Sequence, residues 1–281
     1  MKALILQGLS LGLSLGLPLV LSLGITGCSS KPASSLPKSL LPTETQRSGV
    51  LFTSDTRNLL VSPWDVRYRP LQARHRFQLQ QYLRLFDEEI RKLPPELLAH
   101  SGLKTVAFVR QLAIAEQPRA AVPDYHHEVL YYDITPADPA YLRHVVHHEF
   151  YHMLEQQLYG SAYYQDPAWL ALNPAGFRYG NGGAATREPA AAKFSHPAAG
   201  FLNGYAMSGI EEDKAEIWTV IWAADSWAQV SMLFEQDAIL AAKLRLMLRQ
   251  IQCQLPAMQA AWPAAMKPYL PAAGECGVLG G

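Results

Sequence analysis

The chain has 281 residues, of which 49% are hydrophobic, so it is long enough to bury the core of one sizeable domain. Its 24 lysines and arginines balance 24 aspartates and glutamates, which gives a formal net charge of +0 at pH 7. This balance provides no electrostatic reason to expect a nucleic-acid partner or a polybasic membrane patch, so we expect neither.

The N-terminal segment is typical of an export signal rather than of a folded domain. Lys2 gives it a positive start, and residues 4–23 form an apolar run rich in Leu, Gly and Ser. Residues 25–28, Ile-Thr-Gly-Cys, resemble the lipobox of bacterial lipoprotein signal peptides. The resemblance implies a signal peptide over residues 1–27, cleavage before Cys28, and a lipid on its sulfur and new N-terminus. The alternatives are an ordinary signal peptide and an uncleaved membrane anchor.

The residues after the lipobox indicate where the protein resides. Ser29 stands where an aspartate would favour inner-membrane retention in Gram-negative lipoproteins. We therefore expect a lipid-anchored protein of the bacterial cell envelope, at the outer membrane or cell surface rather than the inner membrane. Residues 28–47 are rich in Ser, Pro and Lys without an apolar period, which predicts a flexible tether. Residues 48–281 are then expected to form a single domain.

The first part of this domain predicts one helix and a few strands. Residues 50–72 carry short apolar pieces interrupted by prolines, which indicates an irregular entry with one strand. Residues 73–93 have apolar side chains at helical spacing and predict a helix. Residues 103–110 and 128–134 are rich in β-branched and aromatic residues and predict two strands.

The segment from Asp138 to Gly160 predicts one long helix with two histidines on the same face. Asp138 is a good N-cap, and Gly160 supplies a stop. His148 and His152 are four residues apart, so both imidazoles can reach a single tetrahedral zinc ion. Glu149 follows His148, where its carboxylate can act on a water bound to the metal.

This region is rich in histidine, so a polar helix with histidines present by chance is the alternative. His144 and His147 lie on the same segment. We expect His144, one turn before His148, to be a satisfied polar helix position, with contact to the cleft as the other possibility. His126 and His127 are expected to be strand-end residues rather than part of the cleft.

The connection between Gly160 and Tyr205 is long and rich in Gly, Ala and Pro, with aromatic residues such as Trp169 and Tyr179. A connection of this length is usually functional or disordered. We expect an ordered loop that forms part of the substrate wall beside the cleft. The alternative is a surface loop whose aromatic side chains pack into the core.

A catalytic zinc needs a third protein ligand besides two histidines. Metzincins have Gly and His where this chain has Glu155 and Leu158, which excludes that class. A carboxylate from a second helix is the remaining possibility. Ser208 and Glu211 predict a capping box that starts a helix over residues 209–224.

Glu212 and Glu216 lie four residues apart on one face of this second helix. We assign Glu212 to the zinc and Glu216 to a hydrogen bond with a ligand histidine, which would fix the tautomer of that histidine. The alternative is an exposed acidic first turn, because carboxylates are favoured near a helix N-terminus. That alternative accounts for Glu211 and Asp213 but poorly for Glu216, which lies one turn further along.

These motifs resemble those of gluzincin-type zinc metallopeptidases, in particular the lethal-factor-like and small bacterial lipoprotein enzymes. The resemblance covers residues 125–225 and rests on His148-Glu-Phe-Tyr-His152, on Glu212-Asp-Lys-Ala-Glu216, and on Tyr205, seven residues before Glu212. It implies that Glu212 is the third zinc ligand and that Tyr205 donates its hydroxyl to the oxyanion of the tetrahedral intermediate. The alternative for Tyr205 is an ordinary loop aromatic.

The C-terminal part predicts scaffold helices over residues 227–234 and 238–253. Cys253 and Cys276 are the two cysteines that remain once Cys28 is lipidated, so they are expected to form a disulfide worth about 3 kcal/mol. The alternative is two free buried thiols. The second of these helices is predicted to expose its basic residues, Lys243, Arg245 and Arg249.

The sequence therefore predicts an α+β, zincin-like fold with a small sheet, a helix carrying the two histidines and a second helix carrying the glutamates. The expected activity is zinc-dependent hydrolysis of a peptide or protein substrate by an endopeptidase that holds one Zn²⁺ per chain. In this reaction Glu149 takes a proton from water and passes it to the leaving amine. Two alternatives stay open: a metallohydrolase of non-peptide amides, and a lipid-anchored binding or uptake protein that keeps the zinc site without turnover.

Overall fold

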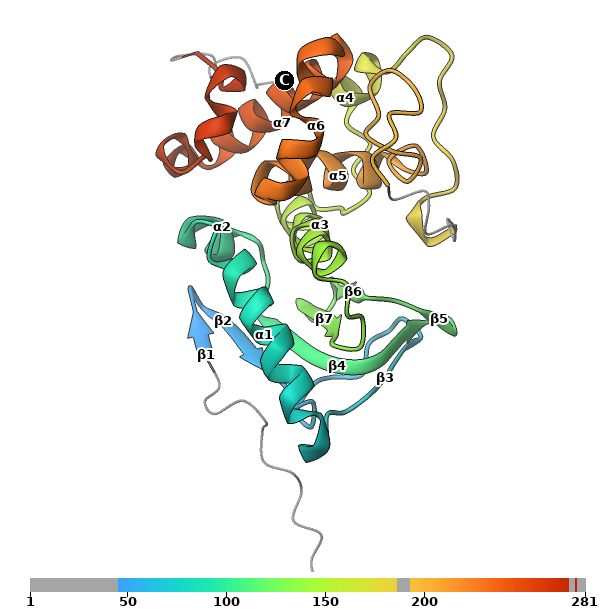
Figure 1. Ribbon diagram of the computed structural model, residues 1–281, viewed down its shortest axis with the longest axis vertical. Coiled ribbons are helices and arrows are strands. Elements are labelled where there is room, and N and C mark those ends of the chain that lie inside the picture. The colour runs from blue at the N-terminus through green and yellow to red at the C-terminus, as the bar shows by residue number, and fades with distance from the viewer. Residues whose placement is uncertain (1–44, 186–192, 273–275, 277–281) are drawn as a thin grey trace, which may run out of the picture. The chain divides into compact units, whose positions relative to one another are not determined.

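The computed structural model describes residues 45–185, 193–272 and 276 (Figure 1). The expected signal peptide, Cys28 and most of the expected tether lie outside these residues. The last three residues of that tether, Thr45–Arg47, form the first strand. Within the described part of the chain, no helix has both the length and the apolar character that a membrane span requires.

The strands of the described residues form one mixed sheet. Its order is β1-β2-β4-β7-β6, and β3 and β5 also pair with β4. β2 and β7 run parallel to β4, and the other pairings are antiparallel. The strands are β1 (Thr45–Arg47), β2 (Val50–Thr53), β3 (Val66–Arg69), β4 (Thr105–Ile114), β5 (Gln117–Pro118), β6 (Ala121–Asp124) and β7 (Val129–Asp133). The two strands predicted around β4 and β7 are confirmed, whereas the entry segment holds two strands instead of one.

Helices account for most of the remaining chain. The α-helices are α1 (Arg76–Ile90), α2 (Pro95–His100), α3 (Pro139–Tyr159), α4 (Pro167–Leu172), α5 (Ile210–Trp222), α6 (Ala224–Gln236) and α7 (Ala238–Gln254). Short 3-10 turns are η1 (Ala73–His75), η2 (Gly183–Ala185), η4 (Pro256–Ala260) and η5 (Ala264–Tyr269). The predicted α+β class is therefore confirmed.

Helices α1 and α3 pack on the same face of the sheet, and α3 also packs against α5 (Figure 1). The rings of Phe86 on α1, Phe108 on β4 and Tyr132 on β7 meet edge to face, with centroids 5.1 Å apart in both pairs that include Phe86. Tyr132 also donates its hydroxyl to the carbonyl of Val146 on α3. The apolar stripe of α3 thus joins the sheet to the helical part of the domain.

The two ends of α3 are those expected from the sequence. Asp138 is the N-cap, and its carboxylate accepts a hydrogen bond from the backbone N–H of Ala140 at 2.9 Å. Gly160 ends the helix in the left-handed conformation with φ 73°. Both signals are local, which explains why they could be recognised without knowledge of the fold.

The start of α5 differs from the expected capping box. Gly209 is the N-cap and makes no side-chain capping bond, because its residue type has no side chain to offer. The hydroxyl of Ser208 instead donates to the carbonyl of Tyr205 at 2.7 Å and closes the turn before the helix. The prediction of Ser208 as N-cap was therefore wrong, although the helix itself begins within one residue of the expected position.

The prediction that α7 exposes its basic residues holds for Arg245, holds only in part for the half-buried Arg249, and was wrong for Lys243. Lys243 is fully buried, and its Nζ lies 2.7 Å from Oδ2 of Asp213 on α5 and 2.8 Å from the carbonyl oxygen of Gly200. The reason is that Asp213 is itself fully buried and a buried carboxylate needs a charged partner. The acidic first turn of α5 is thus interior and not an exposed cap.

The expected disulfide between Cys253 and Cys276 is present, with the two Cα atoms 5.2 Å apart. It links the last turn of α7 to a residue 23 positions further along the chain. The C-terminal segment is therefore tied to the helical scaffold as predicted.

Candidate metal centre

The metal-ligand candidates come from two helices that pack side by side, α3 and α5. Nε2 of His148 lies 2.8 Å from Oε2 of Glu212. Nε2 of His152 lies 3.2 Å from Nε2 of His148 and 3.5 Å from the same oxygen of Glu212. All three side chains are buried. The spacing of four on α3 and the first turn of α5 thus bring three donor atoms to one point.

These three atoms suit a tetrahedral zinc ion. With bonds of about 2.0–2.2 Å, two ligands of a tetrahedral zinc lie about 3.3–3.6 Å apart. The observed separations of 2.8, 3.2 and 3.5 Å approach this range. Two imidazole nitrogens that face each other share at most one proton, whereas a cation satisfies both of them and the carboxylate. Two histidines and one glutamate are also a known ligand set of catalytic zinc.

The pKa values of Glu212 and His148 show how strongly these two side chains attract each other. Burial opposes the charge of Glu212, yet hydrogen bonds from His148 and His152 hold the pKa of its carboxyl well below the usual value. Burial would lower the pKa of His148, but the hydrogen bond to Glu212 and the nearby carboxylate of Glu216 raise it well above the usual value. In the metal-free protein, a proton on His148 therefore neutralises part of the negative charge.

Glu216 lies beside the imidazole of His148 and hydrogen-bonds two other side chains. It accepts a hydrogen bond from Nδ2 of Asn203 at 2.7 Å, and its Oε1 lies 2.8 Å from Nε2 of His144. Nδ1 of His148 is 3.0 Å from the same oxygen, although it is poorly aligned for hydrogen bonding. Burial opposes its charge, but the neighbouring imidazoles lower the pKa of the Glu216 carboxyl to about 2.

His144 is a satisfied polar position, as expected, because Glu216 binds it. His144, His148 and Glu216 also form a second group with the spacing of metal ligands. Asn203 was not recognised in the sequence. Its position two residues before Tyr205 is the signal that could have drawn attention to it.

Glu149 is partly buried and follows His148 on α3. Burial raises the pKa of its carboxyl, and the charges of His148 and His152 oppose this rise only in part. Within residues 45–185 and 193–272, no side chain forms a hydrogen bond or ion pair with this carboxylate. Glu149 is therefore a carboxylate of raised pKa on the residue that follows the candidate ligand His148.

The ring of Tyr205 lies beside that of His148, with the two centroids 5.7 Å apart. Its hydroxyl hydrogen-bonds Glu212, and burial together with the charges of Glu212 and Glu149 raises its pKa far above 10. The hydroxyl therefore stays protonated at neutral pH and remains a hydrogen-bond donor.

The backbone of Gly183 packs directly against the side chains of Glu212 and Tyr205. A Cβ atom at this position would overlap both the carboxylate of Glu212 and the hydroxyl of Tyr205. Only glycine permits such a close approach. Sequence reasoning did not single out Gly183, although it belongs to a pair of adjacent glycines in a segment expected to border the cleft.

A cavity of about 310 Å³ adjoins Glu212. It is lined by Tyr163, Gln165, Tyr179, residues 180–183 and residues 209–212. The connection before Tyr205 therefore borders the candidate site, as expected. Its aromatic residues also pack inward, because both Trp169 and Tyr179 donate hydrogen bonds to Asp213. Helix α4, which Asp166 caps, was not predicted within this connection.

The other histidines of the region lie elsewhere. Nδ1 of His127 is 2.9 Å from Oδ2 of Asp124 in the turn before β7, as expected for a strand-end residue. His147 points away from the site toward α1, where its Nε2 lies 2.9 Å from Oε2 of Glu89. Neither belongs to the candidate metal centre.

No protein-family model matches the chain, and no curated protein matches it. Among solved structures, it is similar to a protein from Bacteroides caccae that was described as a candidate zinc-binding metallo-peptidase. The two chains are 18% identical, the match covers 66% of this chain and 72% of the other, and the TM-score is 0.40.

Metal analysis of single variants tests the ligand set. We expect wild type to bind one zinc per chain and Glu212→Ala to lose it, because two histidines do not hold a catalytic zinc. Glu216→Ala should keep zinc with an affinity about 10–100-fold lower, since it removes a partner of His148. Elemental analysis and chelator competition measure both. Glu211→Ala is the matched control, and full zinc content in Glu212→Ala would contradict the assignment.

The pH dependence of zinc binding follows from the raised pKa of His148. At pH 7 this imidazole is protonated in the metal-free protein, whereas the lowered pKa of Glu212 keeps that carboxyl ionised. Zinc binding must displace this proton, and the pKa of His152 is raised as well, so the affinity should fall at least about tenfold for each pH unit of acidification. Calorimetric titrations in two buffers of different ionisation enthalpy measure the released proton. Equal heats in both buffers would refute this expectation.

Proposed function

We propose that the protein is a zinc-dependent endopeptidase in which Glu149 acts as the general base. The observation that carries this proposal is the convergence of His148, His152 and Glu212 on one point. The carboxylate of Glu149, next to His148, has no hydrogen-bond or ion-pair partner among the described residues. Zinc bound to such a set supplies a Lewis acid that lowers the pKa of a water ligand to about 7.

Three groups of the chain then perform the remaining chemistry. Glu149 takes the proton from water and passes it to the leaving amine, for which its raised pKa is suited. The protonated hydroxyl of Tyr205 donates a hydrogen bond to the oxyanion that develops on the peptide carbonyl. Glu216 is a positioning residue that orients the imidazole of His148 from behind.

The cavity beside Glu212 supports a peptide or protein substrate, because it offers room for one side chain next to the reacting bond. Its lining includes the carboxylates of Glu211 and Glu212 and contains no lysine, arginine or histidine among the described residues. An acidic wall of this kind repels carboxylates. We therefore propose that neutral or basic side chains occupy this cavity.

Turnover of a fluorogenic peptide library, together with denatured protein, tests this function. Glu149→Gln should keep zinc but lose about 10²–10⁴-fold in kcat, because the proton transfer is removed. Tyr205→Phe should lose about 10²–10³-fold in kcat with zinc retained, because one oxyanion donor is missing. Glu96→Gln, on the exposed surface of α2, is the control. A zinc-loaded wild type that cleaves no peptide would favour a binding protein or a hydrolase of non-peptide amides.

We further propose that a lipid on Cys28 anchors this domain to the bacterial cell envelope. The lipobox-like residues 25–28 support this proposal, and so does the disulfide, since disulfides persist in oxidising compartments outside the cytoplasm. Cys28→Ala should therefore move the protein from the membrane fraction to the soluble fraction, while Ser30→Ala should not. Fractionation and intact-mass measurement check this. A mature wild type without an added lipid mass would contradict it.

A further inference from the structure

Three arginines and one histidine gather where β3 leads into η1. Arg69, in β3, is the direct cross-strand partner of Arg110 in β4. Nη1 of Arg110 lies 2.9 Å from Nε2 of His75, and Nε of Arg74 lies 3.1 Å from the same nitrogen. Among the described residues, no carboxylate forms an ion pair with any of the three guanidinium groups. This cluster shares no residue with the candidate metal centre.

The protonation of His75 determines how many hydrogen-bond donors and acceptors the cluster contains. The backbone N–H of Gln72 donates to Nδ1 of His75 at 3.0 Å, as part of the cap of η1. Burial and the charges of Arg110 and Arg74 lower the pKa of the imidazole, so it is neutral. A neutral imidazole has one acceptor nitrogen and one N–H group. In the tautomer that keeps the cap of η1, Nδ1 accepts from Gln72, so Nε2 carries the proton and is a donor.

Three donors therefore meet without an acceptor: the Nε2–H of His75 and the guanidinium groups of Arg74 and Arg110. In the other tautomer Nδ1 carries the proton and faces the backbone N–H of Gln72, so two donors again oppose each other. This backbone group is fixed in the turn, whereas an arginine side chain can change its rotamer. Arg69 adds a third positive charge opposite Arg110, and like charges directly opposite in a sheet are destabilising. A negatively charged acceptor at this point would resolve both conflicts.

We infer that Arg69, Arg74, His75 and Arg110 form a binding site for a phosphate group. Guanidinium groups match the oxygens of a phosphate in a bidentate manner, and the imidazole N–H supplies a further donor. Three positive charges suit a phosphate monoester, which carries a charge of about −1.5 to −2 at pH 7.

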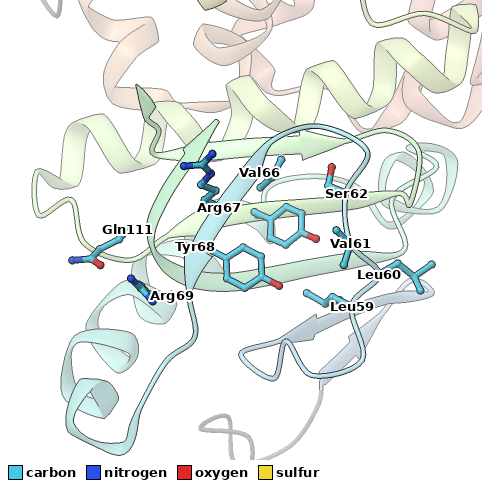
Figure 2. Close-up of a pocket in the computed structure, with 10 residues that line it drawn as sticks. Leu59, Leu60, Val61, Ser62, Val66, Arg67, Tyr68, Arg69 and Gln111 are labelled. Carbon is cyan, nitrogen blue, oxygen red and sulfur yellow. The ribbon is translucent and has the colours of Figure 1, made fainter. Parts of the chain in front are cut away.

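A cavity of about 490 Å³ adjoins this cluster through Arg69. Figure 2 shows Arg69 and Gln111 together at one end of the cavity. Much of its remaining lining is apolar or aromatic, namely Leu59, Leu60, Val61, Val66, Tyr68 and Tyr131. An organic group attached to the phosphate therefore has room beside the arginines. The phosphate could belong to a soluble compound or to a phospholipid headgroup, and both present the same chemistry.

Calorimetric titration of the full chain with inorganic phosphate, at constant ionic strength, tests the site. Wild type should bind phosphate, and Arg74→Gln and Arg110→Gln should each weaken binding at least about tenfold, because each removes a charged donor. Arg91→Gln is the control, since the exposed Arg91 already pairs with Asp87 and lies outside both the cluster and the cavity. It should bind phosphate as wild type does. Unchanged zinc content in all variants shows that they are folded.

Two outcomes would overturn the inference. One is the absence of phosphate binding by wild type, and the other is binding that is lost in Glu212→Ala but unaffected in Arg74→Gln, which would place the phosphate at the metal centre. Vesicles of phosphatidylcholine with and without phosphatidic acid distinguish the two sources. Sedimentation with phosphatidic acid that Arg74→Gln abolishes identifies a lipid headgroup. Phosphate binding without sedimentation identifies a soluble compound.

Discussion

The fold depends on the cost of burying charged side chains on α5. Every residue of this helix is buried, including four carboxylates and one lysine. A buried charge must find a partner, and most partners here lie on other elements. The contacts are Glu212 with His148 and His152, Lys214 with Glu155, Asp213 with Lys243, and Glu216 with His144 and Asn203. Helix α5 thus fixes α3 on one side and α7 on the other.

The same requirement holds the wall of the cavity in place. Asp213 receives hydrogen bonds from Trp169 and Tyr179 in the long connection and from Lys243 on α7. Removing one member of a buried pair costs about 3–5 kcal/mol, because the other charge is left without compensation. The charges that organise α5 therefore also position the loop beside the candidate metal centre. Stability and the shape of the site depend on the same contacts.

The parts of this structure that could be predicted are those encoded by local patterns. Asp138 and Gly160 mark the ends of α3, and the spacing of His148 and His152 is visible within five residues. The parts that could not be predicted depend on long-range partners. Lys243 is buried because it pairs with Asp213, thirty residues away. Helical periodicity does not show which residues of other elements pack against a given face of a helix. The close approach of Gly183 arises in the same way. The chemical roles assigned to the site residues stay predictions.

Two neighbouring histidines of α3 bind helices on two different sides of it. His147 is bound to Glu89 on α1, whose carboxylate also binds Arg143, while the next residue, His148, contacts Glu212 on α5. Consecutive residues of a helix point about 100° apart, so these contacts act in different directions around its axis. The helix is therefore locked against rotation about its own axis. The directions in which its imidazole nitrogens point are set by the fold before any cation arrives.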